Sequence, residues 1–133
     1  MNPLLFLLVL FCASALGGTS RFLLTDATEK HFKSIFPAGT MIVNVTGAFL
    51  IGLLSKVPWE SFGSPIAKDV RLLLITGALG GFTTVSAFSV QNLQLIENKC
   101  WFSATANILG TCSLCFLAVW GGKSSLNFLL SLF

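Results

Sequence analysis

The stretch Gly77–Ser89 reads GALGGFTTVSAFS. Its three glycines, two threonines and two serines lie within residues 70–97, a run of 28 residues that is otherwise apolar enough for lipid. A straight membrane helix needs only about 20 residues, so the surplus predicts a helix that is interrupted near mid-membrane. We expect the interruption at Gly80-Gly81, because glycine adopts backbone conformations that other residues avoid.

An interruption at that depth would favour a binding site. Backbone N–H and C=O groups freed in hydrocarbon must find partners in protein, water or an ion. Unwound carbonyls can hold a cation, and the N-terminus of a half-helix favours an anion. The alternative is close packing of helices at glycine, which is common in membranes. Packing alone does not require the hydroxyl groups of Thr83, Thr84, Ser86 and Ser89, so the composition favours a site.

The overall composition predicts an integral membrane protein. The chain has 133 residues, of which 54% are hydrophobic and 10% are charged, whereas a soluble domain carries about 25% charged residues. The eight basic residues are spread along the chain and give a net charge of only +3. This pattern does not indicate binding to nucleic acid.

The hydropathy pattern predicts an all-α membrane protein with one domain, residues 1–133, and four transmembrane helices. The expected spans are 2–24, 38–56, 70–97 and 101–121. Linkers 25–37 and 57–69 and a tight turn near Asn98-Lys99 separate them, and residues 125–133 are apolar but too short to cross. We expect the first segment to be a retained span and not a signal peptide, because its first basic residue, Arg21, follows the apolar run.

Acidic residues are confined to the linkers and the ends of the spans: Asp26, Glu29, Glu60, Asp69 and Glu97. A carboxylate inside the membrane usually marks a proton or cation relay. The absence of one from the expected spans argues against a proton-coupled pump, and against a small drug exporter that depends on a membrane-embedded Glu.

The distribution of basic residues does not predict one orientation of the chain in the membrane. With four spans, one side of the membrane would hold Lys56, Lys68, Arg71 and Lys123, and the other Arg21, Lys30, Lys33 and Lys99. An excess of Lys and Arg normally sets the orientation. The balance is either a consequence of one misplaced boundary, or it indicates a protein that inserts both ways and pairs head to tail.

Polar residues in the other spans predict an uncharged track through the membrane. Asn44 is central in the second span, and Asn107 and Thr111 lie one turn apart in the fourth. Each could instead join two helices by a hydrogen bond. Phe88 follows the expected interruption, and the positive edge of a phenyl ring can favour an anion.

Cys112 and Cys115 have metal-site spacing, but without a neighbouring His or carboxylate we interpret them as small apolar residues.

Four stretches of the chain resemble motifs of the Fluc (CrcB) fluoride channels. Residues 77–89 resemble G-x-x-G-G-x-T-T-F-S-x-F-S. Residues 17–22 (GGTSRF) resemble the glycine-rich end of the first helix with its Arg, and residues 39–49 (GTMIVNVTGAF) resemble G-T-L-x-x-N-x-x-G-[SA]-F. Residues 107–111 (NILGT) resemble N-[LI]-L-[GL]-[ST]. The resemblance covers essentially the whole chain.

The resemblance implies a passive fluoride channel in the cell membrane, not an enzyme, built as an antiparallel dual-topology dimer in lipid. It implies a structural sodium ion at the dimer centre, held by the backbone carbonyls of Gly80 and Thr83. The fluoride pathway would carry the residues at matching positions and their neighbours: Arg21, Asn44, Ser86, Phe88, Ser89, Gln91, Asn107 and Thr111.

Two positions depart from the family pattern. The family usually has Phe where this chain has Val85, and Glu where it has Gln91. The chain is then either a homodimer with an altered pore lining, or one half of a heterodimer whose paralogous partner supplies the complete pair of phenyl rings. A third alternative is a membrane protein that has a structural or assembly role and transports nothing.

Overall fold

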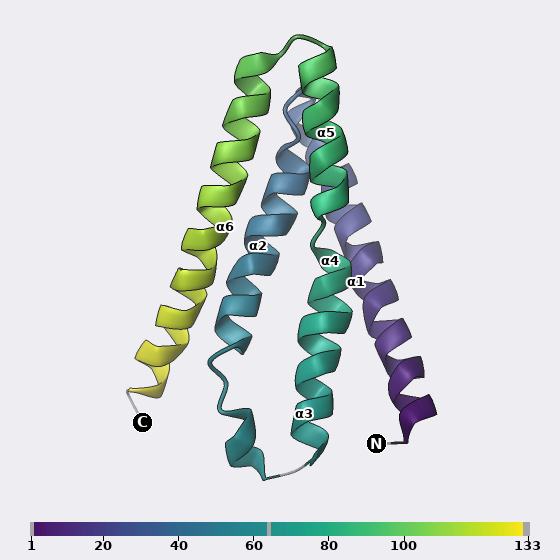
Figure 1. The fold of residues 1–133 in the computed structure, drawn as a ribbon, viewed down its shortest axis with the longest axis vertical. Coiled ribbons are helices and arrows are strands. Elements are labelled where there is room, and N and C mark those ends of the chain that lie inside the picture. The colour runs from purple at the N-terminus through teal and green to yellow at the C-terminus, as the bar shows by residue number, and fades with distance from the viewer. Residues whose placement is uncertain (1, 64, 132–133) are drawn as a thin grey trace.

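The computed structural model describes residues 2–63 and 65–131, and these form a bundle of long helices without strands (Figure 1). The elements are α1 (Pro3–Phe32), α2 (Ala38–Leu54), the 3-10 turn η1 (Trp59–Phe62), α3 (Pro65–Leu72), the π-helical η2 (Leu73–Leu79), α4 (Gly80–Phe82), α5 (Val85–Glu97) and α6 (Trp101–Leu130). The two chain termini lie at one end of the bundle, and the turn between α5 and α6 lies at the other.

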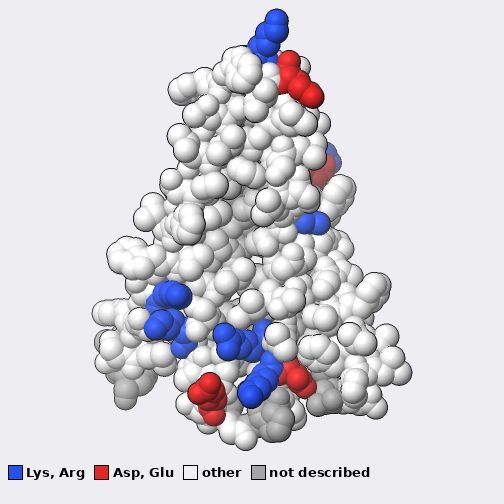
Figure 2. All heavy atoms as spheres, viewed as in Figure 1, with Lys and Arg blue, Asp and Glu red and all other residues white. Residues whose placement is uncertain are grey.

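The helices have the length and polarity of a multi-pass membrane protein. Pro3–Phe32, Ile66–Glu97 and Trp101–Leu130 are long and apolar enough to cross a membrane, and Ala38–Leu54 is a shorter apolar helix. Large apolar side chains such as Phe102 and Phe116 are exposed, whereas several polar side chains are buried. On the face shown in Figure 2, most charged side chains lie toward the two ends of the molecule.

The first and last helices are longer than their apolar segments predict. The expected span 2–24 is part of a helix that continues to Phe32, and the expected span 101–121 is part of a helix that continues to Leu130. Hydropathy marks where lipid ends, but a helix continues in water while local interactions favour it. In α1 these interactions include the i,i+4 pair of Lys30 with Asp26, 2.7 Å apart. Residues 125–130, expected outside the spans, therefore extend α6.

Glycines let α2 and α6 approach each other closely. A Cβ atom added at Gly52 would meet the backbone of Val119, and one added at Gly122 would meet the backbone of Phe49. Two helices that touch at backbone level gain van der Waals contact over their whole crossing, which is the main stabilising term where lipid is as apolar as the side chains. This pairing positions the polar residues of α2 against those of α6.

The third span is interrupted, but not at the expected residues. Gly80 and Gly81 are helical, and the extended backbone lies at Thr83-Thr84. A Cβ at Gly81 would come within 2.5 Å of the carbonyl oxygen of Ser14 on α1. The expectation of a break at Gly80-Gly81 is therefore wrong, because Gly81 serves close packing against α1. The helix ends where side chains of other helices can satisfy its backbone.

Candidate functional site

The break exposes backbone groups in the middle of the third span. The N–H of Thr83 still donates to the Leu79 carbonyl at 2.9 Å. Thr83 has φ −79° and ψ 156°, and Thr84 has φ −153° and ψ 121°, so both are extended. The N–H of Thr84 therefore turns to the side chain of Asn44. The carbonyls of residues 80–82 lose the N–H donors that a continuous helix would supply.

Asn44 of α2 satisfies both backbone groups of Thr84. Its Oδ1 accepts from the Thr84 N–H at 2.8 Å, and its Nδ2 donates to the Thr84 carbonyl at 3.0 Å. The Thr84 hydroxyl accepts from the N–H of Ala87 at 3.2 Å and thereby caps α5. An Asn side chain has two N–H donors, and the bond to Thr84 uses one of them. Within the described part of the chain no hydrogen bond engages the other, which leaves it available beside the break.

Arg21 of α1 also reaches the break. Its Nη1 donates to the carbonyl of Thr83 at 3.3 Å, across 62 residues of sequence. The side chain is half-buried. The guanidinium therefore places a permanent positive charge beside the carbonyls of the interrupted helix.

A mid-span groove of about 420 Å³ lies beside the break. Asn44, Thr83, Val85, Phe88 and Thr111 contribute to its lining, and the other lining residues are apolar or carry thiols, including Cys112 and Cys115. None of the described lining residues is charged. The fold thus gathers an amide, two hydroxyl groups and the phenyl rings of Phe88 and Phe116 around one uncharged groove. These groups come from α2, α5, α6 and the Thr83–Thr84 break.

A chain of buried hydrogen bonds joins α5 to α6. Asn92 Nδ2 donates to the Phe88 carbonyl at 2.8 Å, and Asn107 Nδ2 donates to Asn92 Oδ1 at 3.0 Å. Thr111 Oγ1 donates to Asn107 Oδ1 at 3.1 Å. Asn107 is only 1% exposed and does not line the groove, whereas Thr111 belongs to both. Asn92 was not among the residues expected to have a role, although it lies one helical turn after Phe88.

Ser86 and Ser89 lie on the exposed face of α5 and do not line the groove. The Ser86 hydroxyl is 3.1 Å from the Thr84 hydroxyl, and the Ser89 hydroxyl donates to the Val85 carbonyl at 2.9 Å. Val85 is 77% exposed on the same region of the molecule. A patch with two hydroxyl groups thus faces outward close to the middle of the third span.

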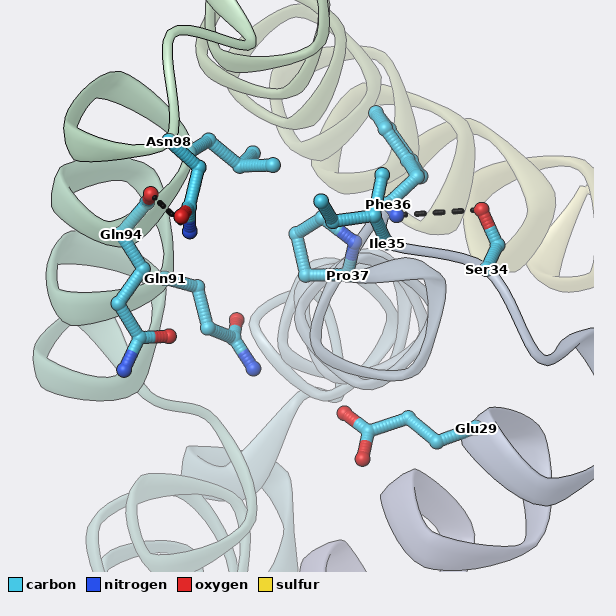
Figure 3. Close-up of a pocket in the computed structure, with 9 residues that line it drawn as sticks. Glu29, Ser34, Ile35, Phe36, Pro37, Gln91, Gln94 and Asn98 are labelled. Carbon is cyan, nitrogen blue, oxygen red and sulfur yellow. Dashed lines mark hydrogen bonds between the residues drawn. The ribbon is translucent and has the colours of Figure 1, made fainter.

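Gln91 lies away from the groove. It lines a second cavity of about 420 Å³, with Glu29 of α1 and with Gln94 and Asn98 (Figure 3). Its Oε1 atom is buried and has no hydrogen-bond partner among the described residues. The expected pathway residues are therefore distributed over the groove, the exposed face of α5, the buried network and this second cavity.

The oxygen donors at the break are neutral backbone carbonyls. The described residues contain no group of three or more His, Cys, Asp or Glu side chains that could hold a metal. The freed carbonyls of residues 80–82 and the Thr83 carbonyl are oxygen donors of the kind that unwound membrane helices offer to sodium. Gly80 is exposed on the outer face of the bundle.

Comparison with known proteins places the chain in a family. A family model described as "CrcB-like protein, Camphor Resistance (CrcB)" matches residues 8–123. The chain belongs to the CrcB family. CrcB relatives include proteins named "Fluoride-specific ion channel FluC" from Opitutus terrae, 40% identical over 81% of this chain and 82% of the relative, and from Hydrogenobaculum sp., 41% identical over 87% and 93%. These relatives are named as ion channels and not as enzymes.

A further CrcB relative carries a numbered name. "Fluoride-specific ion channel FluC 2" from Bradyrhizobium diazoefficiens is 42% identical over 80% of this chain and 77% of the relative.

Proposed function

We propose that this chain conducts fluoride passively out of the cell. The observation that carries the proposal is the broken third span with Asn44, Phe88 and Thr111 around one uncharged groove. The choice of fluoride as the conducted ion follows the names of its CrcB relatives. An uncharged route suits a channel, because conduction requires each contact to be weak enough for the ion to leave.

In the proposed mechanism fluoride exchanges water for a succession of weak protein contacts. Asn44 and Phe88 line the groove. The second N–H of Asn44 and the positive edge of the Phe88 ring are the candidate partners of the anion. The Thr111 hydroxyl proton is held by Asn107, so it contributes only when that hydroxyl rotates toward the ion. Arg21 raises the electrostatic potential near the break and favours an anion there.

A second copy of the chain would complete the pathway. Gly80, Val85, Ser86 and Ser89 are exposed near the middle of the third span. Carbonyl groups without N–H partners are not tolerated against lipid. An antiparallel partner would cover this face and bring Ser86 and Ser89 into the pore. The balanced distribution of basic residues supports opposite orientations of the two copies.

The central cation of the proposed dimer is sodium, held by the carbonyls of Gly80 and Thr83. The geometry fits this assignment in two respects, since Gly80 has lost its helical N–H partner and Thr83 is extended. The Thr83 carbonyl also accepts from Arg21, but a carbonyl oxygen has two lone pairs and can serve both. A bound sodium ion would supply a fixed positive charge between two pores.

The decisive experiment is ion efflux from liposomes that contain the purified chain alone. We expect rapid fluoride efflux and no chloride efflux under the same gradient. Efflux from a single pure chain would also show that a paralogous partner is unnecessary. Absence of fluoride efflux from folded, dimeric protein, both alone and together with a paralogous CrcB protein, would favour a role in assembly without transport.

The heterodimer is a second possibility because of Val85. A side chain that is 77% exposed beside the break offers a small apolar surface where a larger ring from a partner could pack. If the chain alone is silent, co-reconstitution with a paralogous CrcB protein from the same source should restore fluoride efflux.

Sodium is tested by its removal. Replacing sodium with a large organic cation in all buffers should lower both the thermal stability of the dimer and the fluoride efflux, and returning sodium should restore both. Unchanged stability and efflux would exclude the structural sodium ion.

A further inference from the structure

The cavity that contains Gln91 lies at the end of the bundle, where α1 and α5 approach their C-terminal ends (Figure 3). Its volume is about 420 Å³. The polar side chains of Glu29, Gln91, Gln94 and Asn98 line it, together with the segment 34–37 and Leu95. Its position at the end of the bundle makes it accessible to water.

This cavity and the mid-span groove follow the same side of α5. Phe88 lines the groove, and Gln91, three residues later and one turn further along the helix, lines the cavity. The buried Oε1 of Gln91 accepts no hydrogen bond from any residue that the structure describes. A buried polar atom normally pairs with protein or ordered water, so we interpret the cavity as hydrated up to the turn that carries Phe88.

Glu29 brings an uncompensated charge to this cavity. It is the single charged side chain among the described residues that line it. Asp26, one turn earlier on α1, is paired with Lys30 at 2.7 Å. Within the described residues, Glu29 has no such ion pair and its side chain is exposed. The negative charge of its carboxylate therefore repels anions that enter the cavity.

We propose that this cavity is the aqueous mouth of the ion pathway and that the charge of Glu29 limits the rate at which anions pass it. The inference rests on the proposed fluoride conduction and assigns a residue that sets its rate. A carboxylate in a cleft lowers the local concentration of anions, and the effect weakens as salt screens the charge. Gln91 and Gln94 supply amide N–H donors on the opposite wall.

The test compares Glu29→Gln with Glu97→Gln in planar bilayers, with single-channel fluoride conductance as the readout. Glu97 is a matched control because it lies at the same end, is exposed and does not line the cavity. At an ionic strength of about 20 mM we expect Glu29→Gln to raise the conductance roughly two- to fivefold, and Glu97→Gln to leave it unchanged. At about 1 M potassium sulfate the two variants should match the wild type.

A second variant extends the test. Glu29→Lys should raise the low-salt conductance further than Glu29→Gln, since it replaces repulsion by attraction. Equal low-salt conductance in wild type, Glu29→Gln and Glu29→Lys would overturn the inference while leaving fluoride conduction intact. A wild-type protein that conducts no fluoride at all would instead overturn the proposed function.

Discussion

The side chain of Asn44 replaces two backbone hydrogen-bond partners of Thr84. Where the third span is interrupted, Thr84 loses its helical partners, and the Asn44 amide supplies one acceptor and one donor in their place. Lipid offers no alternative partner, so each group left unsatisfied there costs several kcal/mol. An aliphatic side chain could not fulfil this role, and a carboxylate could supply only the acceptor.

At this scale we predict that Asn44→Leu abolishes fluoride efflux and lowers the free energy of unfolding by about 1–3 kcal/mol for each of the two groups left without a partner. The reason is that both the N–H and the carbonyl of Thr84 lose their partner. Reversible unfolding in mixed micelles measures the stability, and liposome efflux measures the function.

Thr46→Val is a suitable control for this prediction, because Thr46 lies on the exposed side of the same helix. It should behave like the wild type in both measurements. Normal unfolding and normal efflux in Asn44→Leu would contradict the assigned role of Asn44.

At the scale of elements, contact between helix backbones determines which helices are neighbours. Gly122 of α6 lies against the backbone of Phe49 and Leu53 on α2, whereas the adjacent Gly121 has open space where a Cβ would be. Two consecutive glycines on one helix therefore have opposite consequences for packing. Gly122 fixes the distance between α2 and α6, and with it the position of Asn44 relative to Thr111.

We predict that Gly122→Ala destabilises the protein by about 1–3 kcal/mol or more, since the added methyl group overlaps backbone that cannot rotate away. Gly121→Ala should be neutral or slightly stabilising, because alanine favours a helix by up to about 1 kcal/mol over glycine. Thermal unfolding of the two variants in detergent makes the comparison. Equal loss of stability in both would show that the α2–α6 contact is not what limits packing.

At the scale of the whole molecule, the structure changes the charge balance. Arg21 belongs to the break and not to a membrane surface, because its guanidinium bonds to Thr83. The basic residues at the ends of the bundle are then Lys30, Lys33 and Lys99 on one side and Lys56, Lys68, Arg71 and Lys123 on the other. Three against four is still close to balance, so the basic residues do not favour one orientation strongly.

We therefore predict that a reporter fused to the C-terminus is found on both sides of the membrane in the wild type. The double change Lys33→Gln and Lys99→Gln leaves one basic residue against four, and it should fix the end that carries the C-terminus in the cytoplasm. Fluoride efflux should fall with it, because antiparallel pairs no longer form.

The double change Glu60→Gln and Glu97→Gln is the control for the orientation test, since acidic residues contribute little to orientation. It should keep the two-sided distribution of the reporter. A wild-type reporter confined to one side would rule out dual topology.

Much of this fold could be predicted from the sequence because the responsible interactions are local. Transfer of an apolar segment into lipid depends on the composition of about 20 consecutive residues, so the membrane class, the order of the spans and the surplus length of 70–97 follow from composition alone. The identities of the polar residues near the break are likewise visible in the sequence. The ends of α1 and α6 were not predictable from hydropathy, because they depend on helix interactions outside the lipid.

The position of the break and the assignment of partners were decided by the tertiary structure. Asn44 meets Thr84 across 40 residues and Arg21 meets Thr83 across 62. Gly80 and Gly81, the residues most able to break a helix, stay helical because Gly81 packs against Ser14 of α1. In a membrane a helix can open only where protein, water or an ion satisfies the freed backbone groups. Here another helix does so, and the relative placement of two helices is not encoded in either segment alone.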